Sequence, residues 1–431
     1  MPLILSLVCQ RWRDVSLSFP RLWAYPRILE RSWDNPNLAD IIECYMTRSQ
    51  TCPLTVELEI PTIDLLRFED DGEDYLRPAL EALVPTSTRW QRLNITGCAV
   101  WLLDHPVFYT IKGRLPILQH LEILQIYSSE VQGEIEFDIF SDCPQLRSLE
   151  TRRSADLFEE DSLLEGILIP WSQIRSCRVD TLESITVLSR PCGSLEHLEI
   201  DDGNEDEAEL TGIAEREERL TLNVSSLKLG GTVRETAINF SLVIDSLTFP
   251  HLSSLDISWL KRTWFTPLLE CLKRSSSTLT CLNLQFDDSL YEETTITPQH
   301  IITLLRHTPK VRTLSIQLYT LCKPFLQEFA LSHETFPNPD PLLPSLEKLS
   351  LWMHRYPQMD DQAVLNAVAS RWLPDPDYAK SVGAACLRSV TIKFPPHVVR
   401  INSRAFFQPD MPSLQDLRAA GMRIDVVLSN H

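Results

Sequence analysis

A unit of three apolar positions, spaced apolar-x-x-apolar-x-apolar, recurs along most of the chain. It first stands out in WQRLNI, where Trp90, Leu93 and Ile95 fill the three positions. It returns at first positions 118, 146 and 174, and then at 195, 224, 252, 279, 311, 346, 387 and 414. The first three intervals are each 28 residues, and the later ones range from 21 to 41. A period of this size predicts a repeat architecture.

Each unit predicts one short strand, because its second and third apolar positions are two residues apart and point to the same face of an extended chain. The residue between them points to the other face, and this position is polar throughout. We expect these residues to form a row on the open side of a sheet, either as plain solvated surface or as a ligand face. The row contains Asn94, Glu122, Glu150, Arg178, Glu199, Lys228, Asp256, Asn283, Ser315, Ser350 and Thr391.

Segments with helical spacing lie between the strands. In residues 297–307, Thr297 is the expected N-cap and Pro298 the first helical residue, followed by an apolar stripe at positions 301, 302, 304 and 305. Residues 263–274 and 360–372 carry similar stripes. A strand and a helix in each repeat predict a curved α/β solenoid, since one such unit buries its apolar face only against its neighbours.

The repeat resembles the leucine-rich-repeat family in its longer, helix-bearing classes, from residue 90 to the C-terminus. The resemblance implies a horseshoe whose concave sheet binds another macromolecule. The family's Asn or Cys position, three residues beyond the last strand residue, is filled by Cys98 in the first unit and usually departs later. We therefore expect irregular repeats, and we assign the solenoid to residues 51–431.

Residues 5–23, LSLVCQRWRDVSLSFPRLW, predict one short amphipathic helix that Pro20 limits. Leu5, Val8, Cys9 and Trp12 lie at helical spacing on one face. An exposed apolar stripe needs a partner, which is either the first repeat or another protein.

This segment resembles the second half of an F-box, as found in fungal families that continue into leucine-rich repeats. The resemblance rests on LVC, RWR, FP and LW in that order, and PLTVELEI at residues 53–60 resembles the first strand of such proteins. We expect an N-terminally truncated F-box within residues 1–50. By position, the residues implied to pack in the F-box core or to contact an adaptor are Leu5, Val8, Cys9, Trp12 and Trp23.

The resemblance further implies a substrate-recognition subunit of an SCF-type ubiquitin ligase, which binds the Skp adaptor and the cullin-based complex. The alternative is a repeat scaffold with no ligase link, in which the N-terminal helix caps the solenoid. Large apolar residues follow several strands, either as exposed interface anchors or as core: Trp259, Phe286, Leu318, Met353 and Phe394, with Trp352 beside Met353. The expected substrate-binding residues are Arg178, Glu199, Lys228, Asp256, Trp259, Phe286, Trp352 and Met353.

Net charge, cysteine content and the lack of catalytic motifs limit the classes of function that the chain could have. A net charge of −19 disfavours nucleic acid and anionic membranes as partners, and no apolar stretch is long enough for a membrane helix. Eleven cysteines without a Cys-x-x-Cys pair favour a reducing compartment, the cytoplasm or the nucleus. We found no catalytic, nucleotide or zinc motif. We therefore expect a protein-binding chain that is not an enzyme and needs no cofactor or metal.

Overall fold

The structure is a computed structural model. It describes residues 2–61, 76–125, 136–153, 166–180, 191–201, 220–230, 241, 244–260, 262–275, 278–286, 296–318, 323–332, 341–353, 361–394 and 412–428. The chain divides into two compact units, Met1–Glu209 and Leu210–His431.

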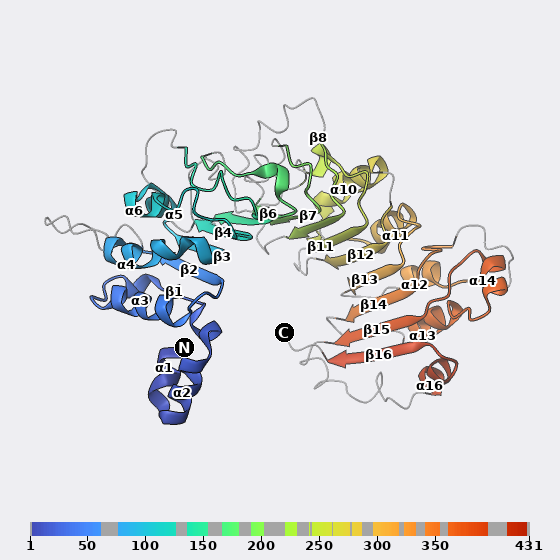
Figure 1. The fold of residues 1–431 in the computed structure, drawn as a ribbon. Helices are drawn as coiled ribbons and strands as arrows, with labels where there is room; N and C mark the ends of the chain where they lie inside the picture. Colours follow the sequence, from blue (N-terminus) through green and yellow to red (C-terminus); the bar gives the residue numbers. More distant parts are fainter. Residues whose placement is uncertain are drawn as a thin grey trace. The chain divides into compact units, whose positions relative to one another are not determined.

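Unit 1 contains a parallel sheet whose strands neighbour one another in chain order. The strands are β1 (Arg27–Ile28), β2 (Leu54–Ile60), β3 (Trp90–Gly97), β4 (His120–Gln125), β5 (Ser148–Arg153), β6 (Ser176–Asp180) and β7 (His197–Asp201). The helices are α1 (Pro2–Val8), α2 (Gln10–Ser18), α3 (Leu38–Arg48), α4 (Leu76–Leu83), α5 (Ala99–Asp104) and α6 (Pro106–Tyr109). Figure 1 shows α3, α4, α5 and α6 beyond one face of this sheet.

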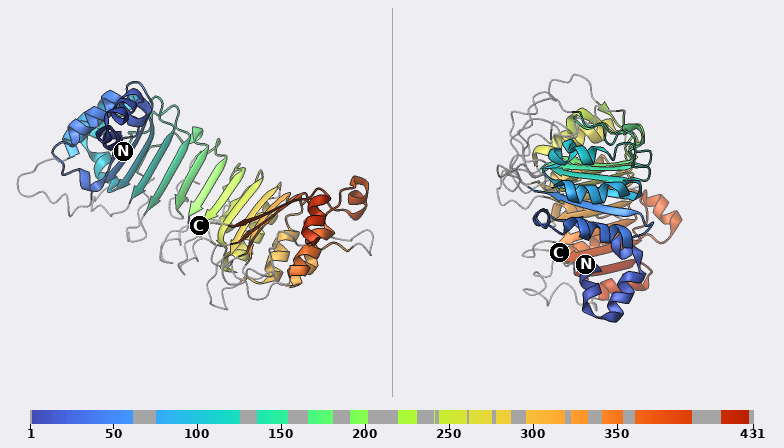
Figure 2. Two further views of the ribbon diagram at one scale, coloured as in Figure 1. Left: turned by 90° about the horizontal axis from the view of Figure 1, so that it is seen from below. Right: turned by 60° about the vertical axis from the view of Figure 1, so that its left-hand side comes forward.

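Unit 2 repeats the plan with a parallel sheet of β9 (Ser226–Gly230), β11 (Ser254–Leu260), β12 (Cys281–Phe286), β13 (Thr313–Leu318), β14 (Lys348–Met353), β15 (Ser389–Phe394) and β16 (Arg423–Leu428). A short parallel pair, β8 (Leu220–Thr221) and β10 (Leu247–Thr248), lies apart from that sheet. The helices are α10 (Arg262–Arg274), α11 (Pro298–Arg306), α12 (Lys323–Phe329), α13 (Asp361–Ser370), α14 (Pro376–Val382) and α16 (Pro412–Ala419). Within each unit the strands run side by side (Figure 2, left).

The strand registers confirm the predicted repeat. The second and third apolar positions of successive units pair with each other, as in Leu93↔Leu121 and Ile95↔Ile123. These side chains are buried, and the polar residues between them pair in register as a row of half-buried side chains on the other face. The prediction holds from β3 to β7 in unit 1 and in β9 and β11 to β15 in unit 2.

The helices between the unit 2 strands confirm the predicted stripes. Thr297 caps α11: its hydroxyl accepts a hydrogen bond from the backbone N–H of His300, while the His300 side chain bonds the Thr297 N–H. Pro298 is the first helical residue, and Ile301, Ile302, Leu304 and Leu305 are buried. Helices α10 and α13 occupy the other two predicted segments. The apolar faces of these strands and helices are therefore buried within the unit.

The last predicted repeat is wrong. Leu414, Leu417 and Ala419 lie in α16, and the final strand is β16, where Ile424 and Val426 pair with Val390 and Ile392 of β15. Leu414 and Leu417 are three residues apart, a spacing that suits a helix face as well as a strand unit. The misplaced unit is therefore an ambiguity of the pattern itself.

The N-terminal segment forms two helices rather than the single helix predicted. Cys9 has φ −162° and ψ 170°, an extended conformation that ends α1 and begins α2. The predicted common stripe is therefore divided, with Leu5 and Val8 on α1 and Trp12 on α2.

Within the described residues, no helix is both long and apolar enough to cross a membrane.

Candidate functional site

Exposed apolar side chains gather on the N-terminal helices and the turn that follows them. Nine large ones have exposed fractions from 40% to 76%, and we call this set the N-terminal apolar surface. It consists of Ile4, Leu7, Val8, Trp12, Val15, Leu17, Phe19, Leu22 and Tyr25. The described remainder of the chain carries only four more such side chains, at Tyr109, Leu168, Tyr378 and Val427. Apolar exposure is therefore concentrated at this end of unit 1.

Trp23 attaches the surface to the body of unit 1. Its side chain is fully buried, and its indole N–H donates to the carbonyl oxygen of Ser16 in α2 at 2.7 Å. The ring meets Tyr45 edge-on with centroids 5.2 Å apart, and the Arg48 guanidinium lies 4.3 Å from the ring centroid. Tyr45 and Arg48 belong to α3, so the tryptophan links α2 to the helix that precedes β2.

A second contact holds α1 against α2. Arg13 Nε donates to the carbonyl oxygen of Ser6 at 2.9 Å, and the two helices pack against each other. Among the predicted adaptor-binding residues, Val8, Cys9 and Trp12 are exposed, Leu5 is half-buried and Trp23 is buried. The structure thus separates a core residue, Trp23, from three residues that a partner can touch.

The open face of the unit 1 sheet carries a network of acids and arginines. Arg178 on β6 contacts three carboxylates: Glu150 at 3.3 Å, Glu199 at 3.3 Å and Asp201 at 2.9 Å. Arg152 on β5 lies 2.7 Å from Glu150 and 3.7 Å from Glu122. We call these six residues, Glu122, Glu150, Arg152, Arg178, Glu199 and Asp201, the unit 1 charge network. Arg178 and Glu199, two predicted substrate-binding residues, therefore contact each other directly.

His120 joins this network at one end. One of its ring nitrogens and one carboxylate oxygen from each of Glu122 and Glu150 lie within 4.8 Å of one another. Its Nδ1 lies 3.0 Å from the hydroxyl of Ser148 on the next strand. Burial lowers the pKa of His120, and the nearby Arg92 lowers it further. Burial, together with the charge of Glu150, raises the pKa of Glu122.

This cluster was not predicted from the sequence, because its three residues match no local zinc motif. The spacing of the three residues in the sequence nevertheless indicates that they lie together. His120 and Glu122 are two residues apart on one strand, and Glu150 lies 28 residues beyond Glu122, which is one repeat. Side chains two apart on a strand share a face, and one period further on lies the neighbouring strand. Strand and repeat periods together therefore predict the juxtaposition.

The open face of the unit 2 sheet is less charged. Asn283 donates to Asp256 at 2.8 Å, and the Lys393 ammonium lies 4.0 Å from the Trp352 ring centroid. Lys228 and Asp256 pair in register on β9 and β11. Trp352 is half-buried. Of the six predicted substrate-binding residues in unit 2, Lys228, Asp256 and Trp352 lie on the open side of its sheet. Arg178 and Glu199 belong to unit 1.

Phe286 was expected to bind substrate, but its side chain is not accessible on the open face. Its side chain is buried at the end of β12 and continues the inward alternation of Leu282 and Leu284, so it is core and not an exposed anchor. The register shifts between Ile257 and Leu260 in β11, where Leu260 pairs with Phe286. The side chains of Trp259, Leu318, Met353 and Phe394 lie outside the described residues.

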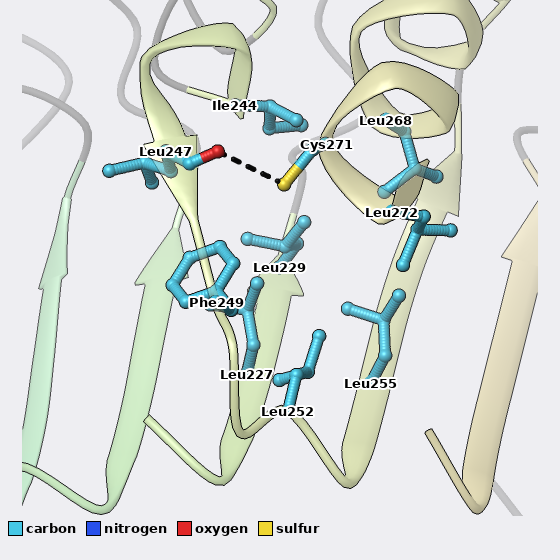
Figure 3. A pocket seen from close by; sticks show the side chains of 10 residues that line it. All are labelled: Leu227, Leu229, Ile244, Leu247, Phe249, Leu252, Leu255, Leu268, Cys271 and Leu272. Carbon is cyan, nitrogen blue, oxygen red and sulfur yellow. Dashed lines mark hydrogen bonds between the residues drawn. The ribbon is translucent and has the colours of Figure 1, made fainter. Parts of the chain in front are cut away.

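A small cavity lies within the core of unit 2, between β9, β11 and α10 (Figure 3). Its lining is wholly apolar apart from the Cys271 thiol, which donates to the carbonyl oxygen of Leu247 at 3.4 Å. The lining residues are Leu227, Leu229, Ile244, Leu247, Phe249, Leu252, Leu255, Leu268, Cys271 and Leu272. A ligand site needs a few polar groups to orient its occupant, and this cavity has the character of a packing defect.

Comparison with known proteins assigns no family. No protein-family model matches the chain, and no curated protein matches it. Among solved structures, the chain is similar to one in the "Crystal structure of TLR13-ssRNA13 complex", where TLR13 is a leucine-rich-repeat protein. The TM-score is 0.35 at 11% identity, over 88% of this chain and 54% of that one. The chain thus spans about half the length of that protein, and a likeness this distant indicates neither family nor function.

Proposed function

We propose that this chain is a non-catalytic interaction subunit that docks a partner protein on its N-terminal apolar surface and holds a second protein on the open faces of its sheets. On the F-box resemblance of residues 5–23, the docked partner is the Skp adaptor of an SCF-type ubiquitin ligase. The second protein is then the ligase substrate.

The N-terminal apolar surface carries this proposal. Removing a large apolar side chain from water contributes about 1.5–3 kcal/mol when burial is complete. Nine large apolar side chains within residues 4–25 are at least 40% exposed. Burying them against a partner would therefore contribute a large favourable free energy to binding. Exposed apolar groups concentrated in this way mark protein interaction sites. The surface includes Trp12, and tryptophan is a frequent interface anchor.

The sheet faces suit the second role. Their rows of polar side chains are half-buried and mixed in sign, which favours specific recognition over nonspecific adhesion. A substrate held there and an adaptor held at the N-terminal helices are joined by one chain. The mechanism is effective concentration: the substrate is kept near a ubiquitin-charged enzyme elsewhere in the complex.

The test is a pull-down of the full chain with the Skp adaptor of its own organism. The variant carries Val8→Asp and Trp12→Ala, which place a charge on the exposed surface and remove an anchor without touching a buried side chain. The matched control is Leu168→Asp, which charges an exposed apolar side chain elsewhere in unit 1.

We expect the wild-type chain and Leu168→Asp to bind the adaptor and the double variant to lose most of the binding. Absence of binding by a folded wild-type chain would contradict the ligase role and leave the repeat scaffold. Equal binding by all three proteins would show that the adaptor uses another surface.

A further inference from the structure

We propose that His120, Glu122 and Glu150 form a binding site for a divalent transition-metal cation of the Zn²⁺ type on the open face of the unit 1 sheet. This site is independent of the proposed adaptor function, because it lies on β4 and β5 and not on the N-terminal helices.

The ligand set has the composition of an open zinc site. An imidazole and two carboxylates are donors that Zn²⁺ accepts, and three protein ligands leave a fourth position for water or for a partner's side chain. The three donor atoms lie within 4.8 Å of one another. Ligand atoms around tetrahedral Zn²⁺ are about 3.4 Å apart, given bonds of roughly 2.1 Å, so side-chain adjustments of about 1 Å would complete the geometry.

The strands hold the donors in place. His120 and Glu122 are two residues apart on β4, and Glu122 pairs in register with Glu150 on β5. Coordination through Nε2 of His120 would keep the contact between its Nδ1 and Ser148, and a bond of this kind orients metal-binding histidines.

The local charge favours a cation. Four carboxylates of the unit 1 charge network face two guanidiniums, and Arg92, which pairs in register with His120, adds a third cation, so one negative charge is in excess. Both arginines of the network contact the same oxygen of Glu150, Oε1, and a carboxylate has a second oxygen for a metal. Arg152 would compete with the metal ion, because its guanidinium contacts both Glu122 and Glu150.

The chain contains its own control. The tetrapeptide His-Leu-Glu-Ile occurs at residues 120–123 on β4 and again at residues 197–200 on β7. At the first copy, the neighbouring strand places Glu150 opposite Glu122. At the second copy it places Arg178 opposite Glu199, and the guanidinium lies 3.3 Å from that carboxylate. Arg178 lies on the strand before β7, whereas Glu150 lies on the strand after β4, and among the described residues the second copy belongs to no cluster of three donors.

The test is equilibrium dialysis of the full chain, stripped with a chelator, against Zn²⁺ at neutral pH. The variants are His120→Ala, Glu150→Gln and Arg152→Gln, with His197→Ala as the matched control. Because free cysteines also bind Zn²⁺, the same proteins are titrated with Co²⁺, whose absorption spectrum separates sulfur ligands from nitrogen and oxygen ligands.

We expect about one ion per chain in the wild type and in His197→Ala, and loss of that ion in His120→Ala and Glu150→Gln. Arg152→Gln should tighten binding by about fivefold or more, because a positive charge near the cation is removed. A misfolded variant does not produce such a gain. No stoichiometric binding, the same binding in His120→Ala as in the wild type, a sulfur-type Co²⁺ spectrum, or no gain in Arg152→Gln would overturn the site.

Discussion

Trp12 and Trp23 lie in the same N-terminal segment, but their surroundings differ. Trp23 is fully buried against Tyr45 and Arg48, whereas Trp12 is 49% exposed. We predict that Trp23→Ala lowers the free energy of unfolding by about 3–5 kcal/mol, because it leaves a cavity between α2 and α3. Trp12→Ala should cost less than about 1 kcal/mol. Urea unfolding followed by circular dichroism measures both, and equal losses would contradict the assignment of Trp12 to a docking surface.

His120 should make the free energy of unfolding of the chain depend on pH, and a single substitution can isolate this contribution. Its pKa in the folded chain lies below the ordinary value of 6.5, so the unfolded chain binds the proton more readily. The stability that the neutral imidazole contributes is therefore present above about pH 6.5 and is lost as the pH falls through that value.

We predict that the wild type loses more unfolding free energy than His120→Gln between pH 7.5 and pH 5.5. Urea titrations in the presence of a chelator make the comparison, with His197→Gln as the control that should behave as the wild type. A wild type and a His120→Gln variant with the same pH dependence would show that His120 is not protected from protonation.

At the scale of elements, the end of β3 depends on a glycine. Gly97 has φ +98° and pairs in register with Ile60 of β2, and a Cβ added to it would overlap the carbonyl oxygen of Ile60. Gly113 also has a positive φ, +70°, but a Cβ there would meet nothing within 4 Å.

Gly97→Ala should therefore destabilise the chain by more than about 1 kcal/mol beyond Gly113→Ala, because it adds a backbone clash to the conformational strain that both share. Thermal unfolding of the two variants gives the difference. A Gly97→Ala protein as stable as Gly113→Ala would mean that β2 and β3 separate easily at this end.

The strands were predictable because the repeat encodes them locally. Leu93 and Ile95 point one way and Asn94 the other, and each later unit repeats that alternation. The final strand was missed because Leu417, three residues after Leu414, fits a helix equally well. The break at Cys9 was missed because side-chain spacing alone continues across it, while the backbone becomes extended there.

For the molecule as a whole, the open faces of the two sheets were predictable in composition but not in contacts. Register follows from the repeat, so the polar rows could be written down from the sequence. Which side chains pair across strands depends on the rotamers of long side chains: Arg178 contacts Glu150 and Glu199, its neighbours in the row, and also Asp201, which is not in the row. The exposure of the N-terminal apolar surface could not be predicted from the sequence either, because the spacing of apolar residues is the same whether the stripe packs on the first repeat or faces solvent.

The proposed function depends on whether a partner covers the N-terminal apolar surface, and the reactivity of Cys9 measures this directly. Cys9 is the exposed cysteine among those that the structure describes, and it lies between α1 and α2. Cys143 and Cys271 are buried, and burial raises the pKa of the Cys143 thiol to about 12, so both should react slowly in any state. Half-buried Cys386 in unit 2 serves as the unchanged reference.

The decisive measurement is the rate at which a maleimide labels each cysteine of the native chain, read by peptide mass spectrometry with and without the Skp adaptor. We predict that a saturating amount of adaptor slows the labelling of Cys9 several-fold and leaves the labelling of Cys386 unchanged. Labelling of Cys9 at the same rate in both samples would contradict the docking of the adaptor on the N-terminal apolar surface.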